Sequence, residues 1–510
     1  MRKQPYPISD LTGGMNVSKD AVYLIDKMSP HIKGARFSQG ILKKDFGWHT
    51  FGTGLPLDGI PMLIDTFYLQ SGTEHLLVVT TKWVYLYNPT TGVYTKKNTT
   101  AFTGNIDNQF CSATTLTAGG ADIFILTNGK DPIQKWDGSS NPFSALGGLT
   151  NITAEFVIPF MSRLILGNTT EGGTHCPRRI RWSIAGDPET YTGTGSGFVE
   201  LVNTVDWISS LIGIKSKLFI IKERSIWELV YVGNTTENMY FTLACRLEGV
   251  GTYSPGSVVA LGEEIVFFGT DNVYTYDTLT LTPIGVNIYP MLYETEKKVV
   301  TTTVLNRCPA TFIEELNEYW IVVPTSGGYC DLFLKYSFET QSWVLRDKTV
   351  STLGYYSVVS TTGIWAEATG TWAEGSGSWM DKALPSGAPT TLIGTPDGYI
   401  YEDDRLTKST DSMLFETKDF TFQHASRIVE FRIQAKGGPF QVYYSLDQGS
   451  TWSKAFQFPV STEFREHVAF LNLTTQHIRF KVTSIAEDLD IKWIEPWYIP
   501  RTRSKSLISH

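Results

Sequence analysis

A hairpin-like pattern that recurs roughly every 45–49 residues limits most strongly the folds open to this chain. In each unit a polar turn joins two apolar runs rich in β-branched and aromatic residues, as in VYLYNPTTGVYT and VYTYDTLTLTPIG. Anchors at Tyr85, Gln134, Trp182, Trp227, Tyr274, Leu334 and Tyr399 give spacings of 49, 48, 45, 47, 60 and 65 residues. Four strands per 40–50 residues are typical of a propeller blade. We expect an all-β fold with an irregular β-propeller of six or seven blades, although two stacked β-sandwiches remain an alternative.

The pattern changes near residue 405. Segments such as SRIVEFRIQAKG and EHVAFLNLTTQHIRFKVTS alternate apolar and polar residues with period two, which predicts an antiparallel β-sandwich over 406–500. The propeller is assigned to 51–405, with insertions in its two longest spacings and one or two short helical turns in 290–305. Residues 1–50 do not look like a blade, so we interpret them as an extended arm that closes the propeller or reaches a neighbour. Residues 501–510 form a polar tail.

Charge and cysteine content exclude several classes of protein. The formal net charge is −8, and an acidic chain gains no affinity for nucleic acid from counterion release. The densest basic cluster, Arg178, Arg179 and Arg181, is interpreted as a solvated strand face. The 5 scattered cysteines include no CxxC pair, which argues against a disulfide framework or zinc site and favours a reducing folding compartment. We expect neither a signal peptide nor a membrane span.

Candidate catalytic groups do not form a convincing constellation. The 8 histidines lack the spacings of metal ligands. His175-Cys176 is the only His/Cys neighbour pair and is interpreted as part of a loop. The paired carboxylates Glu263-Glu264 and Asp403-Asp404 are expected in exposed turns. The chain is therefore predicted not to be an enzyme, with no catalytic, cofactor-binding or metal-binding residues.

The sharpest local motif is Ser445-Leu-Asp447-Gln-Gly449-Ser-Thr451-Trp452. It resembles the Asp-box, S-x-D-x-G-x-T-W, of sialidase-type propellers. In those families the Asp accepts backbone N–H bonds in a hairpin turn, the Gly takes a positive φ and the Trp packs beneath, away from the active site. The resemblance implies a structural role for Asp447, Gly449 and Trp452, and it keeps a carbohydrate-binding or sialidase-like propeller open as an alternative function.

A second motif, TGIWAEATGTWAEGSGSWMD, places Trp365, Trp372 and Trp379 seven residues apart. The GTG and GSGS sequences between them disfavour a helix, so the spacing does not indicate a coiled coil. We expect a loop or ribbon that presents three aromatic anchors. These anchors would pack either in the propeller core or at an interface with a neighbouring subunit, where Trp is enriched among the residues that contribute most to binding.

Four segments in order resemble the tail hub or nozzle proteins of short-tailed bacteriophages, also called packaged-DNA stabilisation or tail tubular B-type proteins. They are the opening Gly13-Gly14-Met15-Asn16 with Pro30 and LKKDFG (42–47); GVGTYSPGSVVALGEEIVFFGTDNVYTYD (249–277); the Trp-rich motif followed by GTPDGYIYEDD (394–404); and the C-terminal segment with its Asp-box-like turn. Lys44-Asp45 stands where that opening usually has an Arg followed by a small residue or Pro, and residues 100–220 carry no motif of the family.

The resemblance implies a structural virion protein that forms a closed ring, commonly a hexamer, below the portal and its adaptor ring. Such a ring contacts tail-fibre or tail-tip proteins, and viral DNA passes through its lumen without specific binding. The protein would fold in the host cytoplasm and reside in the virion tail. A net charge of −8 agrees with this role, because like charge prevents DNA from sticking. Gly13, Gly14, Asn16 and the three Trp are the predicted assembly residues, and a receptor-binding tail-tip protein is a further alternative.

Overall fold

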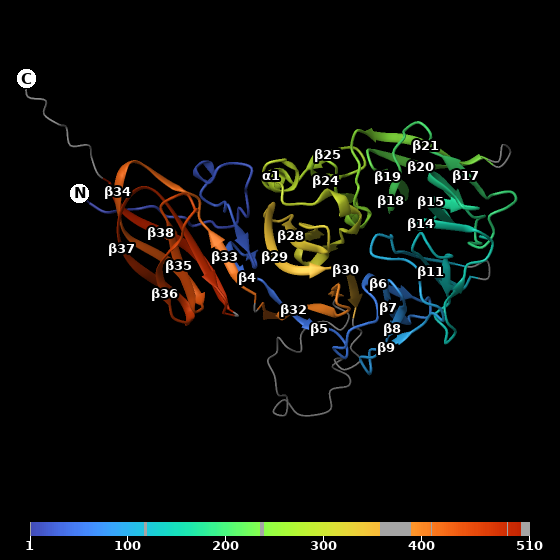
Figure 1. The fold of residues 1–510 in the computed structure, drawn as a ribbon, viewed down its shortest axis with the longest axis horizontal. Helices are drawn as coiled ribbons and strands as arrows, with labels where there is room; N and C mark the ends of the chain where they lie inside the picture. Colours follow the sequence, from blue (N-terminus) through green and yellow to red (C-terminus); the bar gives the residue numbers. More distant parts are fainter. Residues whose placement is uncertain are drawn as a thin grey trace, which may run out of the picture.

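The computed structural model describes residues 2–116, 120–234, 239–357, 389–409, 411–486 and 488–500. Strands supply most of the regular structure, which has two parts (Figure 1). A ring of blades forms one part, and an elongated stack of strands that contains both the first and the last described strand, β1 (Gln4–Pro5) and β38 (Leu489–Ile499), forms the other (Figure 1). The all-β class predicted from the sequence is confirmed.

Six four-stranded antiparallel sheets form separate blades. The first two contain β6 (Pro61–Tyr68), β7 (Glu74–Thr80), β8 (Val84–Tyr87) and β9 (Tyr94–Lys96), then β10 (Cys111–Leu116), β11 (Asp122–Thr127), β12 (Gln134–Trp136) and β13 (Ser144–Ala145). The next two contain β14 (Ile152–Phe160), β15 (Arg163–Glu171), β16 (Thr174–Trp182) and β17 (Gly197–Glu200), then β18 (Ile208–Ile214), β19 (Lys217–Lys222), β20 (Ser225–Asn234) and β21 (Met239–Glu248). The last two contain β22 (Val259–Leu261), β23 (Glu264–Phe268), β24 (Val273–Tyr276) and β25 (Leu281–Pro283), then β30 (Thr352–Ser357), β31 (Pro389–Gly394), β32 (Ile400–Lys408) and β5 (Phe46–Thr50).

A seventh set of four strands completes the ring. It consists of β26 (Ala310–Ile313), β27 (Glu318–Val323), β28 (Cys330–Ser337) and β29 (Ser342–Val350). Its inner strand β26 contacts β22 on one side and β30 on the other, and β30 in turn contacts β6. Its outer strand β29 also pairs with β2 (Ile32–Lys33), so this blade is continuous with the C-terminal sheet. The predicted propeller of six or seven blades is confirmed, with six separate sheets and one shared set.

The N-terminal segment contributes strands to both parts of the molecule. Strand β5 pairs with β32 and is the fourth strand of the last blade, so the segment closes the propeller. Strands β1 (Gln4–Pro5) and β4 (Ile41–Lys44) pair with β38, and β3 (Ala35–Ser38) pairs with β4. The interpretation of 1–50 as an arm that closes the propeller agrees with this pairing, but the assigned start of the propeller at residue 51 leaves out its closing strand β5. The blade pattern was not visible there because the partner strand lies about 350 residues away in the sequence.

The C-terminal unit is an antiparallel sandwich of long strands. It contains β33 (Met413–Glu416), β34 (Phe420–Gly437), β35 (Phe440–Ser445), β36 (Ser453–Phe458), β37 (Ser461–Ser484) and β38 (Leu489–Ile499). Strand β37 pairs with β34 over its first part and with β33 and β35 over its last part, so it passes from one layer to the other. One apolar core runs from Phe431 and Phe480 in this unit to Trp343 in the shared blade.

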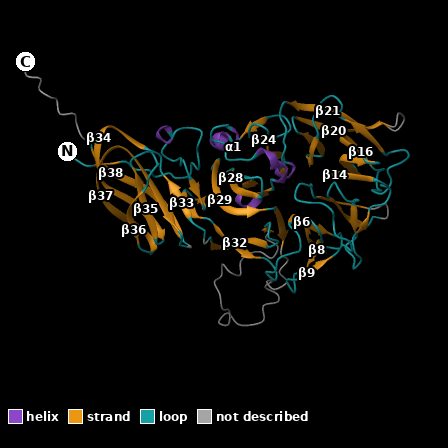
Figure 2. Ribbon diagram, in the orientation of Figure 1, coloured by secondary structure: helices purple, strands orange, loops and turns teal. Residues whose placement is uncertain are grey.

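The few helical turns lie mainly in the connections around the fifth blade and the shared blade (Figure 2). They are η1 (Ala21–Tyr23), η2 (Pro255–Ser257), η3 (Val286–Ile288), α1 (Tyr289–Tyr293), η4 (Thr302–Arg307) and η5 (Glu314–Leu316). The 60-residue spacing after Tyr274 is explained by the insertion that contains η3, α1 and η4. One or two short helical turns were predicted in 290–305, and α1 and η4 overlap that range. The following spacing contains residues 358–388, which lie outside the described part of the chain.

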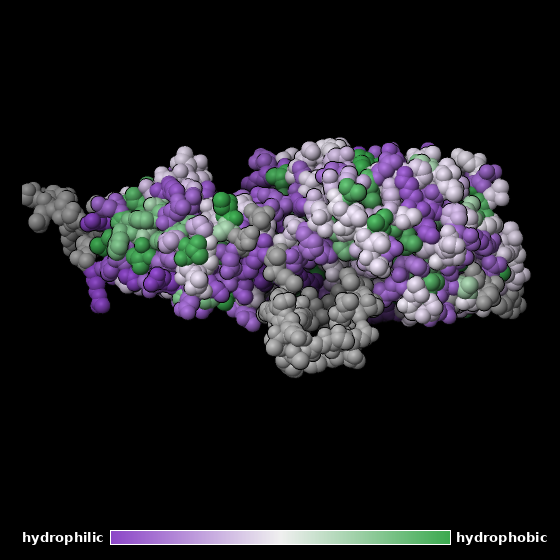
Figure 3. All heavy atoms as spheres, turned by 90° about the horizontal axis from the view of Figure 1, so that it is seen from below, coloured by the Kyte–Doolittle hydropathy of each residue, from purple (hydrophilic) through white to green (hydrophobic). Residues whose placement is uncertain are grey.

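Because the strands of each blade are antiparallel, the connections between them lie on two opposite faces of the propeller. The connections between successive blades emerge on the same face as the hairpins between second and third strands, and we name this the crossover face. The other hairpins emerge on the opposite face, named the hairpin face. In a view along the side of the molecule, apolar residues gather over the C-terminal unit and are scattered among polar residues on the propeller (Figure 3).

Candidate assembly surfaces

The segment Gly13-Gly14-Met15-Asn16 lies against β29 of the shared blade. Gly14 adopts a φ of +65°, and a Cβ atom there would lie 2.5 Å from Cβ of Ser342. The amide of Met15 donates a 2.8 Å hydrogen bond to the carbonyl of Trp343. A Cβ atom at Gly13 would lie 2.7 Å from the carbonyl oxygen of Lys27. The two glycines thus allow a backbone approach that a residue with a side chain would block.

Asn16 fixes this segment to the crossover face. Its side chain is buried, and Nδ2 donates to Oδ1 of Asn287 at 3.1 Å. Its Oδ1 accepts hydrogen bonds from the amide and the hydroxyl of Ser18 at 2.9 and 2.8 Å. Asn287 belongs to η3 in the connection that follows the fifth blade. Gly13, Gly14 and Asn16 therefore hold the chain's own N-terminal segment on the propeller.

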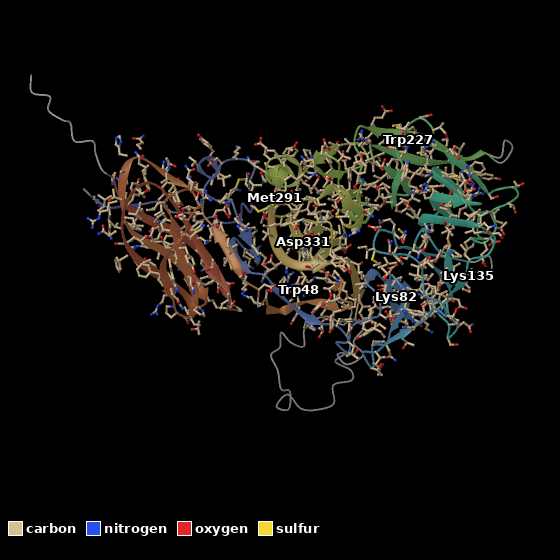
Figure 4. All side chains as sticks on the ribbon, viewed as in Figure 1. Trp48, Lys82, Lys135, Trp227, Met291 and Asp331 are labelled. Carbon is tan, nitrogen blue, oxygen red and sulfur yellow. The ribbon has the colours of Figure 1, made fainter. Side chains whose placement is uncertain are left out.

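A buried ion cluster that the sequence did not predict lies where the N-terminal segment enters the propeller. Asp45 is fully buried, and its carboxylate accepts a 2.9 Å bond from Nζ of Lys335, with Nε of Arg346 at 3.4 Å. The Arg346 guanidinium stacks 3.4 Å from the ring centroid of Trp48, which lies near the junction of the two parts (Figure 4). The only sequence signal was the unusual Lys44-Asp45 in the opening motif. The cluster anchors β5 from both β28 and β29.

Asp403 belongs to the same cluster, so the expectation that Asp403-Asp404 forms an exposed turn was wrong. Asp403 lies within β32, its side chain is buried, and Oδ1 accepts from Arg346 at 3.2 Å. Burial raises the pKa of Asp403, and the charge of Arg346 opposes that rise. Glu263 does lie on the surface, with 82% of its side chain exposed. Asp403 and Glu263 therefore differ in burial because of their tertiary contacts, which two adjacent acidic residues in the sequence do not reveal.

The Asp-box-like turn joins β35 to β36 and adopts the predicted geometry. Asp447 Oδ1 accepts from the Thr451 amide at 2.9 Å and from the Ser445 hydroxyl at 2.7 Å. The Thr451 hydroxyl hydrogen bond is the largest of the effects that lower the pKa of Asp447, to about 2. Gly449 adopts a φ of +91°, and Nζ of Lys481 lies 4.0 Å from the ring centroid of Trp452. The structure thus brings Asp447, Gly449 and Trp452 together in a turn of the sandwich.

We predict that Asp447→Ala speeds hydrogen exchange of the Thr451 amide by at least tenfold, because that amide loses its acceptor. The measurement is hydrogen–deuterium exchange by mass spectrometry on the peptide containing the turn. The folded-state pKa of Asp447 is depressed, so the carboxylate stabilises the turn above the ordinary Asp pKa and loses this effect as pH falls through about 2. Ser450→Ala is the matched control, since the Ser450 amide bonds to the backbone carbonyl of Asp447. Equal exchange in the two variants would contradict the assignment.

Trp365, Trp372 and Trp379 all lie outside the described residues. The flanking strands are described: β30 ends and β31 begins with the pair Ser357 and Pro389. These two strands are the first and second of their blade, so the segment between them starts and ends on the hairpin face.

The arginine cluster and the His-Cys pair both lie in β16. Arg179 and Arg181 form ion pairs with Glu171 at 2.8 and 2.6 Å, so the interpretation as a solvated face was wrong for these two residues. His175 was expected in a loop but belongs to the strand, and Nε2 lies 2.7 Å from Oδ1 of Asn168. Cys176 instead contacts the carbonyl of Thr174. His175 and Cys176 therefore have different partners and do not form a dyad.

A carboxyl group on an inner strand connects to this histidine. Glu155 of β14 accepts a 2.7 Å bond from Nδ2 of Asn168, the residue that contacts His175. Burial raises the pKa of Glu155 to about 7. Sequence reasoning missed this residue, because one Glu in an apolar strand gives no signal of its depth.

Two connections meet across the propeller axis on the crossover face. Arg307 of η4 pairs with Asp107 at 2.7 Å, and the side chain of Gln109 donates to the carbonyl of Asn306 at 2.8 Å. Asp107 precedes the second blade, and η4 lies between the fifth blade and the shared blade, almost opposite in the ring. The contact therefore spans the centre of the propeller, where Figure 1 shows the connection that leads into the second blade running inward.

The connection 201–207 presents apolar side chains on the crossover face. Val202, Val205 and Trp207 are 62%, 88% and 50% exposed. An ion pair holds this connection on the blade, because the buried Nζ of Lys222 lies 2.9 Å from Oδ1 of Asp206. Burial acts to raise the pKa of Asp206, but its hydrogen bonds, including that from Lys222, lower it to about 2. A fixed backbone that displays Trp and Val is suited to protein contact, since little conformational entropy is lost on binding.

A groove of about 720 Å³ lies where the N-terminal segment crosses the end of the sandwich. Its walls include Tyr6, Phe422 and Tyr498, with the rings of the last two 4.7 Å apart. Lys418 donates to the hydroxyl of Tyr6 at 3.2 Å and pairs with Asp26. Aromatic walls with a few polar groups are typical of ligand sites, so this groove is where the carbohydrate-binding alternative would be tested.

Among the described residues, no group of three or more His, Cys, Asp and Glu side chains is placed to hold a metal ion. The described part of the chain also contains no helix long and apolar enough to cross a membrane.

No protein-family model matches this chain, and no curated protein matches it either. Among solved structures, it is similar to a quinonprotein alcohol dehydrogenase-like protein from Bacteroides thetaiotaomicron, with 14% identity, coverage of 55% of this chain and 65% of that chain, and a TM-score of 0.32. It is also similar to the computationally designed Ika8 protein, with 12% identity, coverage of 78% and 100%, and a TM-score of 0.31.

A third similar structure is an exo-β-1,3-galactanase from Phanerochaete chrysosporium, with 9% identity, coverage of 89% of this chain and 100% of that chain, and a TM-score of 0.27. This chain thus spans just under two thirds of the alcohol dehydrogenase-like protein. Because all three TM-scores are low, the fold assignment depends on the strand pairing and not on these similarities.

Proposed function

We propose that this chain is a ring-forming structural subunit of the tail hub or nozzle of a short-tailed bacteriophage. The observation that carries the proposal is the ordered set of four segments, from Gly13-Gly14 to the turn at Ser445–Trp452, that resemble this family. The ring is expected to be a hexamer below the portal adaptor, in contact with tail-fibre or tail-tip proteins. It would retain the genome and conduct it.

The architecture supports such a subunit in two respects. A shared core and a continuous sheet join the propeller to the C-terminal unit, so the molecule can transmit load between neighbours as one body. Its two propeller faces carry different connections, and a head-to-tail contact joins two different surfaces. In the proposed ring the lumen lies between subunits, since the Asp107–Arg307 contact crosses the axis of each propeller. A net charge of −8 would keep DNA mobile in that lumen.

We expect the purified full chain to form closed rings, alone or with the portal-adaptor protein of the same virus. Mass photometry gives the number of subunits, and negative-stain imaging shows closure. A chain that stays monomeric at micromolar concentration with the adaptor present would contradict the proposal. Binding of a glycan on an array by such a monomer would favour the carbohydrate-binding alternative, and competition with phage adsorption would favour the receptor-binding one.

A further inference from the structure

A small pocket opens on the crossover face between the connections 249–258 and 284–309. Its volume is about 230 Å³, which is room for one large side chain. It is lined by Tyr253, Phe268, Leu292, Tyr293, Lys298 and Val300. The rings of Phe268 and Tyr293 stack at 5.4 Å, and the hydroxyl of Tyr293 donates to the carbonyl of Gly269 at 3.0 Å. The walls are therefore aromatic and fixed in place, and a lysine contributes to the lining.

Exposed apolar side chains on the same face are grouped with the pocket under the name crossover surface. It consists of Val202, Val205, Trp207, Tyr253, Val286, Tyr289 and Val299, with exposed fractions between 38% and 88%. These residues belong to three successive connections between blades, at 201–207, 249–258 and 284–309. Tyr253 links them, because it lines the pocket and its hydroxyl accepts a hydrogen bond from Nε of Arg224. The backbone amide of Arg224 in turn donates to Oδ2 of Asp206, in the connection 201–207, at 3.1 Å.

The segment 358–388 contains residue types that match the aromatic and basic lining of this pocket. Its 31 residues contain three tryptophans, and each is followed two positions later by an acid: Trp365 by Glu367, Trp372 by Glu374 and Trp379 by Asp381. With three acids and one lysine, its net charge is −2. A tryptophan matches aromatic walls and can lie against the Lys298 ammonium group, and the acid beside it would face Lys298 and Arg224.

The place where this segment leaves the fold favours a second copy as the one whose pocket it fills. Ser357 and Pro389 lie on the hairpin face, whereas the pocket lies on the crossover face of the same propeller. Half of the segment, about 15 residues, can reach roughly 50 Å at most when extended. A neighbour whose crossover face is turned toward this hairpin face is therefore within range. A contact between two different faces is heterologous, which is the kind that builds rings.

We propose that a tryptophan of the segment 358–388 in one copy of the chain occupies the pocket formed by Tyr253, Tyr293 and Lys298 in a second copy. The inference rests on the proposed ring assembly and specifies its contact. The W-x-E/D repeat supplies three equivalent anchors, so the segment can engage the pocket without one fixed register.

The first test measures, by fluorescence anisotropy, the binding of a labelled peptide, residues 361–382, to the full-length chain diluted until it is monomeric, so that no neighbouring copy fills the pocket. We expect saturable binding, at least tenfold weaker with Lys298→Glu and lost when the three tryptophans of the peptide are changed to Ser. Lys297→Glu is the matched control, because Lys297 is exposed and pairs with Glu294 outside the pocket lining. Equal binding to the Lys298→Glu and Lys297→Glu variants would overturn the assigned pocket.

The second test uses the full-length chain with Trp365, Trp372 and Trp379 all replaced by Ser. We expect the wild type to form rings and this variant to remain monomeric at the same concentration, with unchanged circular dichroism. If the variant forms the same rings, the inferred contact is wrong and the proposed function stands. If wild type diluted until it is monomeric binds peptide only after its own tryptophans are removed, the segment occupies the pocket of its own copy and the proposed occupant is wrong. If no condition yields rings, the proposed function fails. The peptide titration then still tests whether the tryptophan segment binds to the pocket.

Discussion

Replacing Asp45 by Ala should lower the free energy of unfolding by about 3–5 kcal/mol, the usual range for breaking a buried ion pair from one side. The substitution leaves Lys335 and Arg346 buried without their central counter-charge. It also removes the carboxylate that accepts the 3.0 Å hydrogen bond of the Phe46 amide at the start of β5. Because β5 closes the propeller, we expect the unfolding midpoint in urea to fall, monitored by tryptophan fluorescence.

Two controls separate the buried charge from loss of charge in general. Glu263→Gln removes a carboxylate that is 82% exposed and paired with Lys215, so it should leave the midpoint unchanged. Asp403→Asn should cost less than Asp45→Ala, because Asp403 pairs with Arg346, whereas Asp45 pairs with both Lys335 and Arg346. If Asp45→Ala unfolds at the same urea concentration as Glu263→Gln, the cluster does not hold the closing strand.

The same cluster should make stability depend on acid. Burial acts to raise the pKa of Asp45, but Arg346 and Lys335 outweigh it, and the net pKa is lowered. A group with a depressed folded-state pKa stabilises the fold above its unfolded pKa, near 3.9, and loses this contribution as pH falls through the folded value. The wild type should therefore lose part of its advantage over Asp45→Ala only below about pH 4. Urea midpoints of both proteins at pH 7 and at pH 3.5 give this difference.

Replacing Gly14 by Ala should lower the free energy of unfolding by about 3 kcal/mol, combining left-handed backbone strain with overpacking. The new Cβ atom would lie 2.5 Å from Cβ of Ser342 and 2.8 Å from the carbonyl oxygen of Trp343. The backbone would have to move away from β29, and the 2.8 Å bond from the Met15 amide would be lost. Thermal unfolding by differential scanning fluorimetry measures the loss.

Gly40→Ala is the matched control for this substitution. Gly40 has a similar φ of +73°, but a Cβ atom there would meet nothing within 4 Å. The control should cost only the strain, about 1 kcal/mol. A loss for Gly14→Ala no larger than that of Gly40→Ala would mean that the contact with β29 contributes nothing.

The local sequence pattern was sufficient to predict the elements that form between residues close together in the chain. The hairpins that contain Tyr85 and Tyr274 belong to blades, and the turn at Ser445–Trp452 has its predicted hydrogen bonds. Strand alternation and turn residues encode these elements directly, since each depends on contacts within about 20 residues. The candidate site was harder to predict from the sequence. Trp207, Tyr253 and Val299 of the crossover surface belong to three separate connections, and none of these connections carries a motif of its own.

The sequence by itself determined the strand content, the repeat of blade units and the change to a sandwich near residue 405. Only the tertiary structure decided how the ring closes, because β5 pairs with β32 across most of the chain. It also decided that Asp45 and Asp403 are buried while Glu263 is exposed. Such outcomes depend on which distant side chains meet and on how far they exclude water, and the local order of residues does not specify either.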